Sequence, residues 1–498
     1  MMRPILILLA LLLVAAACSS SDGSSAEAPT AQGDSGDTST PTDPQPDAAA
    51  DASDDSASAP VWVGPGTEGL RWSGLVPGVL TFRGNPTRTY YGSGPVPTAP
   101  QVVWRRSGYC APDPETGEQS CGSGWASQPA VFERSGRTWL VAATMDGKIS
   151  FLDADTGEDL LPPFQTDGPI KGTVTIDPEG FPLAYIGSQD GRMRVISFDR
   201  ERPTELWSVD GDDFSPVLFS DDWDGAPLVL EDYLFAGGEN GALHVFRLNR
   251  STDSDGIVAV APELVFFGPT WDDQLLADIG DENVSVETSV AVVGDTLYLA
   301  NSAGRVQGWD IGPIRRGEDP TVVFQFWTGD DTDASVVVDD AGYVYVGSDY
   351  ERFNERAARV GQVLKLDSTQ PDDPVVWSVN DADPTRQSGP IGTPAVSGSM
   401  VYASTAEGRL LGVDRTTGDV VWEKTLGGKL WGSPVVVDGV LLQGDCDGGL
   451  WAFDVSDQSV DPPQLWRTQL NGCIESTPTV WRGRIYVGTR AGELYALG

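Results

Sequence analysis

The chain has 498 residues and a formal net charge of −41 at pH 7. Nucleic-acid phosphates and anionic lipid headgroups would repel so acidic a protein, which argues against a nucleic-acid-binding protein and against a polybasic hold on a membrane. A single histidine and the lack of a C-x-x-C spacing also argue against histidine-pair catalysis and a zinc site.

The first 17 residues have the pattern of a secretory signal peptide. One arginine precedes the apolar run 5–14, which is too short to cross a bilayer as a stable helix. The following Ala-Ala-Ala-Cys resembles a bacterial lipobox, so we expect cleavage before Cys18 and lipidation of its thiol. Ordinary cleavage near Ala17 is the alternative. We therefore expect an exported protein, anchored by lipid to the extracytoplasmic face of a bacterial membrane.

Residues 18–60 are predicted to form a disordered acidic tether. After Cys18 they are mainly Ser, Ala, Asp, Pro, Thr and Gly, with no aromatic or basic residue. Such a segment cannot bury enough apolar surface to offset the entropy of ordering it. Residues 61–98 lead into the folded body, and we expect them to pack on its rim.

Residues 99–498 consist of short alternating apolar runs separated by Gly and Asp, which predicts an all-β fold. The clearest repeat, residues 392–427, reads as four strands joined by tight turns, the pattern of one propeller blade. Eight such units predict an eight-bladed β-propeller of four-stranded antiparallel blades. The last unit stops after three strands. Because residues 99–108 match the outer strands of other units, we predict that they complete the last blade and close the ring.

Four cysteines remain besides Cys18, an even number that favours disulfides in an exported protein. Cys110 and Cys121 flank one loop, and Cys446 and Cys473 lie in neighbouring repeats, so we expect each of these two pairs to be bonded. His244 lies in the alternating run "ALHVF" and is expected to be structural.

The stretches "LLGVDRTTGDVVW" and "ISFLDADTG" resemble the PQQ-type propeller repeat, in which an apolar strand, Asp and Thr-Gly precede a Trp in the outer strand. The resemblance implies tryptophans that dock between blades. The Trp position is occupied by Trp104, Trp207, Trp377, Trp422 and Trp466, with Trp327 as a looser match. The family includes quinone-dependent dehydrogenases and an outer-membrane assembly lipoprotein, so the resemblance predicts the fold better than the function.

Aligning the repeats at the start of each innermost strand selects one residue per blade, three positions earlier. In blade order these are Ala126, Lys171, Asp224, Glu287, Asp333, Ile391, Trp431 and Glu475. They should encircle one mouth of the axial channel. Asp224, Glu287 and Asp333 come from consecutive blades and would repel one another, so we predict them as ligands of a divalent cation such as Ca²⁺. Lys171, Trp431 and Glu475 are predicted to contact a ligand. The alternative is that these acids only line a solvated channel mouth in a very acidic protein.

These features predict a monomeric, noncatalytic binding or scaffold protein of the cell envelope. Its partners would be envelope proteins, or a small ligand at the axis or rim. A dehydrogenase that uses PQQ and Ca²⁺ is the alternative, because Lys171, Trp431 and the acids are the kinds of residue such a site uses. An adjacent Cys-Cys pair and a C-x-x-C-H haem motif are missing, however. We therefore expect no obligatory cofactor; Ca²⁺ is compatible with the acids, whereas PQQ is disfavoured.

Overall fold

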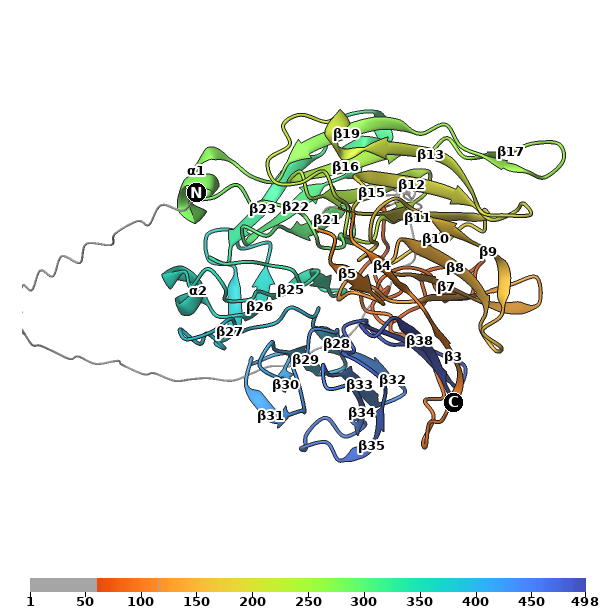
Figure 1. Cartoon of the computed structure of the whole chain (residues 1–498). Coiled ribbons are helices and arrows are strands. Elements are labelled where there is room, and N and C mark those ends of the chain that lie inside the picture. Colours follow the sequence, from red (N-terminus) through yellow and green to blue (C-terminus); the bar gives the residue numbers. More distant parts are fainter. Residues whose placement is uncertain (1–60, 115) are drawn as a thin grey trace, which may run out of the picture. The chain divides into compact units, whose positions relative to one another are not determined.

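The computed structural model describes residues 61–114 and 116–498. The predicted signal peptide, the lipidation site at Cys18 and the tether at 18–60 lie outside the described residues. Eight sheets of four or five strands surround one axis, which confirms the predicted eight-bladed β-propeller (Figure 1). No helix in the described ranges is long and apolar enough to span a membrane.

The first four blades follow chain order, and each runs from an inner to an outer strand. Blade 1 contains β6 (Ala130–Arg134), β7 (Arg137–Ala143), β8 (Lys148–Asp153) and β9 (Asp159–Gln165), with β1 (Gly78–Val79) added at its inner edge. Blade 2 contains β10 (Thr175–Ile176), β11 (Leu183–Gly187), β12 (Arg192–Ser197) and β13 (Thr204–Asp210). Blade 3 contains β14 (Leu228–Leu230), β15 (Tyr233–Gly238), β16 (Ala242–Arg247) and β19 (Glu263–Pro269). Blade 4 contains β20 (Ala291–Val293), β21 (Thr296–Ala300), β22 (Arg305–Asp310) and β23 (Thr321–Trp327).

The remaining blades continue in the same order. Blade 5 contains β24 (Val337–Val338), β25 (Tyr343–Gly347), β26 (Val363–Asp367) and β27 (Val375–Val379). Blade 6 contains β28 (Ala395–Ser397), β29 (Met400–Ser404), β30 (Arg409–Asp414) and β31 (Val420–Thr425). Blade 7 contains β32 (Val435–Val437), β33 (Val440–Gly444), β34 (Gly449–Asp454) and β35 (Gln464–Gln469). Blade 8 contains β36 (Thr479–Trp481), β37 (Arg484–Thr489) and β38 (Glu493–Leu497), with β2 (Gly92–Ser93) at the inner edge and β3 (Val102–Ser107) outside.

Short elements decorate the loops. Two small ladders join β4 (Cys110–Pro112) to β5 (Gln119–Cys121) and β17 (Ser251–Thr252) to β18 (Val258–Ala259). The helices are α1 (Asp273–Ile279) and α2 (Glu355–Val360), with 3₁₀ turns at Gly211–Asp213 and Gly312–Arg316. The helix α1 lies in the connection between blades 3 and 4, and α2 lies in the insertion between β25 and β26 of blade 5.

The two ends of the propeller sequence meet in blade 8. Strand β3 pairs antiparallel with β38, so that Trp104 lies opposite Ala496. This pairing confirms the predicted closure by residues 99–108, and it leaves no unpaired seam between the first and last blades.

The repeat signature is explained by how neighbouring blades contact one another. Asp414 accepts hydrogen bonds from the backbone N–H groups of Thr416 and Thr417, which shapes the turn after β30. Gly418 follows with a positive φ of 79°, and a Cβ there would lie 2.6 Å from the ring of Trp377 in the preceding blade. The Trp377 indole also donates to the carbonyl of Arg415. Asp, Thr-Gly and Trp are thus the parts of one inter-blade contact, as the resemblance implied.

Residues 80–91, here called the axial segment, reach further inward than the rim packing expected for residues 61–98. Backbone N–H groups of blades 2, 4 and 5 donate to the carbonyls of Leu80, Pro86 and Thr87. The guanidinium of Arg83 donates to the carbonyls of Pro394 and Pro434 in blades 6 and 7. One short segment can bond to innermost strands of so many blades only where these strands converge. The axial segment therefore lies across the propeller axis.

Candidate functional site

Hydroxyl groups link equivalent repeat positions near the axis from blade 4 to blade 7. In the position just before the innermost strand, the backbone N–H of one blade donates to the side-chain hydroxyl of the next. Such bonds run from Ser289 to Ser335 at 2.8 Å, from Ser335 to Thr393 at 3.0 Å and from Thr393 to Ser433 at 2.9 Å. Equivalent positions thus neighbour one another around the axis. We call the residues two positions earlier, the eight predicted from the sequence, the inner ring.

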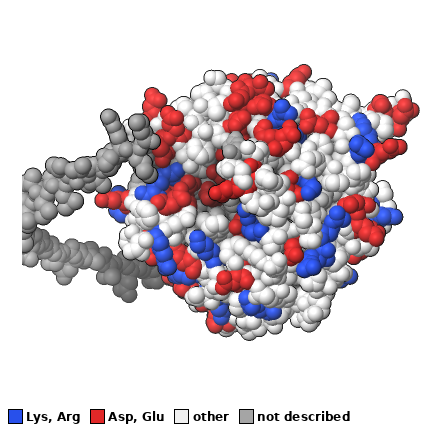
Figure 2. Space-filling view, in the orientation of Figure 1, with Lys and Arg blue, Asp and Glu red and all other residues white. Residues whose placement is uncertain are grey.

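The inner ring brings Lys171 and Asp224 into direct contact. The ammonium Nζ of Lys171 lies 2.6 Å from Oδ2 of Asp224 and 3.9 Å from Oε1 of Glu239. Carboxylate oxygens of Asp224, Glu239 and Glu287 all lie within 4.8 Å of one another. Figure 2 shows acidic side chains gathered near the centre of the ring of blades. Blades 2 to 4 therefore form an acidic sector with one internal cation.

These carboxylates are short of hydrogen-bond donors. Asp224 is fully buried, and beyond the ammonium of Lys171 its carboxylate oxygens have no hydrogen-bond partner among the described residues. Oε1 of Glu239, which is 3% exposed, also lacks one. Glu287 accepts from Ser285 at 3.1 Å. Buried polar groups are normally paired, and Lys171 supplies a single positive charge to Asp224 and Glu239.

Burial and mutual repulsion shift the pKa values of the side chains in this sector. Burial first, and then the charges of Asp224 and Glu287, raise the pKa of Glu239 well above its usual value. Burial and the charge of Asp224 also raise the pKa of Glu287. The pKa of Lys171 is raised, because its carboxylate neighbours outweigh the opposing effect of burial. The sector therefore favours an added positive charge, which would allow Glu239 and Glu287 to ionise.

Asp333, the third predicted metal ligand, lies beside the three-carboxylate group rather than within it. Burial raises its pKa well above the usual value, and the charges of Glu287, Asp349 and Glu351 add to the shift. Asp349 is fully buried, and burial raises its pKa to about 8. Blade 5 thus extends the acidic sector without completing the ligand set.

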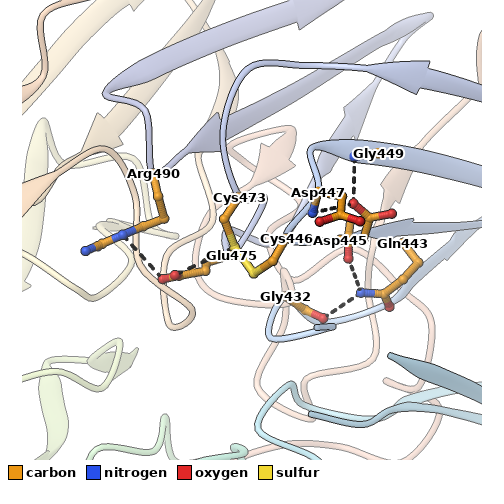
Figure 3. The surroundings of a disulfide bond; sticks show 10 residues. Gly432, Gln443, Asp445, Cys446, Asp447, Gly449, Cys473, Glu475 and Arg490 are labelled. Atoms are coloured by element: carbon orange, nitrogen blue, oxygen red, sulfur yellow. Dashed lines mark hydrogen bonds and ion pairs between the residues drawn. A yellow bond between two sulfur atoms is a disulfide. The ribbon is translucent and has the colours of Figure 1, made fainter. Parts of the chain in front are cut away.

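Glu475 and Trp431 lie in a different part of the inner ring. The Glu475 carboxylate faces Arg490 at 3.6 Å and lies next to the Cys446–Cys473 disulfide (Figure 3). The half-buried ring of Trp431 has the ammonium of Lys429 4.8 Å from its centre. Glu475 and Trp431 therefore lie apart from Asp224 and Glu287, and their predicted contact with a ligand stays a prediction.

Sequence reasoning missed Glu239. It comes from the turn between β15 and β16, in "GGENG", whereas the inner ring lies before the innermost strands. The same turn position holds Ser302 in blade 4 and Arg490 in blade 8, and these residues contact the inner ring at Glu287 and Glu475. Extending the repeat alignment to this turn would have found a second ring of residues above the first.

The disulfides and His244 agree with expectation. Cys110 is bonded to Cys121 and Cys446 to Cys473. His244 is fully buried among aromatic rings, with the rings of Trp223 and Phe214 centred 4.6 and 4.7 Å away. Its role is to pack blade 3.

Part of the propeller matches a known protein family. Residues 359–497 match the family described as "Outer membrane protein assembly factor BamB". Comparison with curated protein sequences gives no match. Among solved structures, BamB from Moraxella catarrhalis is 17% identical with a TM-score of 0.53, and the match covers 80% of this chain and 97% of that one.

Two dehydrogenases share the fold as well. The quinohemoprotein alcohol dehydrogenase from Comamonas testosteroni is 13% identical with a TM-score of 0.55, and that of Pseudomonas putida HK5 is 11% identical with a TM-score of 0.58. Each match covers 84% of this chain and 80% of the other. Such low identities establish the fold alone. The chain is an eight-bladed propeller, and its residues 359–497 are similar to the repeat family described for BamB.

Proposed function

We propose that this protein is an exported, lipid-anchored propeller that acts as a noncatalytic binding scaffold at the cell envelope and holds a divalent cation in its axial mouth. The lipobox-like segment before Cys18 and the BamB-like fold support the scaffold role. The observation that carries the cation site is the convergence of Asp224, Glu239 and Glu287 within 4.8 Å.

The charge and ligand chemistry of this group suit Ca²⁺. Three ionised carboxylates and one ammonium leave two negative charges, which a divalent cation would neutralise. Carboxylate oxygens are the ligands that Ca²⁺ prefers. The cation would compete with Lys171 for Asp224. The ring of Trp125, whose centre lies 5.2 Å from Nζ of Lys171, offers the displaced ammonium a cation–π contact.

PQQ fits the same mouth poorly. It carries three carboxylates, whereas Lys171 is the single cation of the inner ring and already faces Asp224. The disulfide near the mouth joins Cys446 and Cys473, which are 27 residues apart rather than adjacent. The proposed role therefore involves no quinone chemistry. We expect the rim and loops to serve as contact surfaces for other envelope proteins.

Thermal unfolding and cross-linking test this proposal. Millimolar Ca²⁺ should raise the Tm of the purified protein, and Glu287→Gln should abolish the rise. Cross-linking in intact envelopes should capture other envelope proteins. An unchanged Tm in Ca²⁺ would contradict the cation site. A quinone absorbance band together with dye-linked alcohol oxidation would contradict the noncatalytic role.

A further inference from the structure

A second candidate site lies away from the three-carboxylate group, in blade 6. A pocket of 310 Å³ separates the linker that follows β27 from the turn between β29 and β30. Its lining includes Asp381, Asp383 and Arg386 from the linker, Glu407 from the turn, and Arg409 from the start of β30. One water molecule takes up about 30 Å³ of liquid, so the pocket has room for a small organic molecule.

Four of these five charged side chains are already paired. Arg409 donates to both carboxylate oxygens of Glu423 at 2.8 Å and also contacts Asp381. Arg386 donates to Asp383 at 2.9 Å. Asp381 further accepts from the backbone N–H of Gly389 at 3.1 Å. The paired charges fix the walls of the pocket and cancel one another.

Glu407 is the fifth of these charged side chains, and it has no ion-pair partner in the described part of the chain. Its two carboxylate oxygens are shielded from solvent, although the residue as a whole is half-buried. Burial raises its pKa, and the nearby Thr405 hydroxyl and the charge of Arg386 oppose that shift only in part, while Asp383 adds to it. The Thr405 hydroxyl is the neutral group next to this carboxylate. A shielded carboxylate without an ion pair favours a cationic donor at this end of the pocket.

The geometry points to a binding site for a small primary amine, whose ammonium group would pair with Glu407 while its organic body fills the pocket beside Ala382 and Pro384. One unpaired carboxylate calls for one positive charge with several N–H donors, which an ammonium group supplies. A metal ion fits less well, because Ca²⁺ takes six or more oxygen ligands and the other carboxylates here are engaged. The site is independent of the proposed cation site in blades 2 to 4.

Calorimetric titration of the purified protein with propylamine tests this inference. Propylamine should bind, and Glu407→Gln should weaken its binding at least tenfold. N,N,N-trimethylpropylammonium has the same charge but no N–H donor, so it should bind at least tenfold more weakly than propylamine. The matched control is Asp447→Asn, which changes the equivalent position of blade 7, before Gly448, and should leave the affinity for propylamine unchanged.

A second variant separates loss of the site from misfolding. Ala382→Phe should fill the pocket and block propylamine without altering Glu407, while Tm stays within a few degrees of the parent protein. Both variants should keep the Ca²⁺-dependent rise in Tm, because their pocket lies outside the three-carboxylate group. Absence of propylamine binding, or equal binding by the parent protein and Glu407→Gln, would overturn the inference.

Discussion

The ammonium of Lys171 lies 2.6 Å from Oδ2 of Asp224, although the two residues precede different blades. Asp224 is fully buried, and the side chain of Lys171 is 16% exposed. The pair therefore forms at the inner end of the mouth, where two further carboxylates converge. This internal cation partly neutralises a site that still carries excess negative charge.

Removing that internal cation should make stability depend on an added one. Lys171→Met leaves Asp224 buried and unpaired, which typically costs about 3 kcal/mol or more. Urea unfolding in EDTA should show this loss, and Ca²⁺ should restore more stability to the variant than to the parent protein. The control Lys424→Met breaks a surface pair with Asp461, whose side chain is 67% exposed, and should cost about 1 kcal/mol or less. Equal losses from the two variants would contradict the account.

The acids of blade 5 should make the fold more stable at lower pH. Asp349 has a pKa of about 8, raised first by burial and then by the charge of Glu351. Since the folded state disfavours its ionised form, the free energy of unfolding should fall as pH rises from 4 to 8 in EDTA. Asp349→Asn keeps an acceptor for Gln387 and should be the more stable protein at pH 8, with a shallower fall. The exposed control Asp372→Asn should follow the parent protein. A slope unaffected by Asp349→Asn would count against this assignment.

The disulfide between blades 7 and 8 should contribute more to stability than the hairpin disulfide. It closes a separation of 27 residues, against 11 for Cys110–Cys121. Loop-closure entropy gives about 3 kcal/mol for loops of this size, slightly more for the longer one. Replacing Cys446 and Cys473 together by Ser should therefore lower the guanidinium midpoint more than replacing Cys110 and Cys121. In reducing buffer, where neither disulfide remains, the two double variants should have equal guanidinium midpoints, which is the internal control. The reverse order of midpoints in oxidising buffer would contradict the prediction.

Closure of the ring should depend on Trp104. Its side chain is 9% exposed, and its indole N–H donates to the carbonyl of Ala154 in blade 1 at 2.9 Å. Trp104→Ala should cost about 3–5 kcal/mol, whereas Trp104→Phe keeps most of the packing and should lose about 1 kcal/mol with the hydrogen bond. Denaturant unfolding measures both. Val103→Ala, on the exposed face of the same strand, should have little effect; a loss as large as that of Trp104→Ala would refute the closure argument.

The sequence predicts the parts of this molecule that repeat. Eight units, their closure and the inner ring follow from residues that recur at fixed spacing, and the Asp, Thr-Gly and Trp positions proved to be one inter-blade contact. Glu239 was not predicted because it comes from a different turn of the repeat than the inner ring does. The path of the axial segment could not be predicted from the sequence. It has no repeat partner, and it buries Arg83 and Arg88 completely, at left-handed φ values of 53° and 63°, against the ordinary preference of arginine for the surface.

Equilibrium dialysis of the purified protein against Ca²⁺ tests the central claim most directly. The parent protein should bind one ion that is lost in Glu239→Gln, because Glu239 supplies one of the three converging carboxylates. The exposed control Asp372→Asn should bind as the parent does. Failure of the parent protein to bind Ca²⁺ at millimolar concentration, or undiminished binding by Glu239→Gln, would contradict the account.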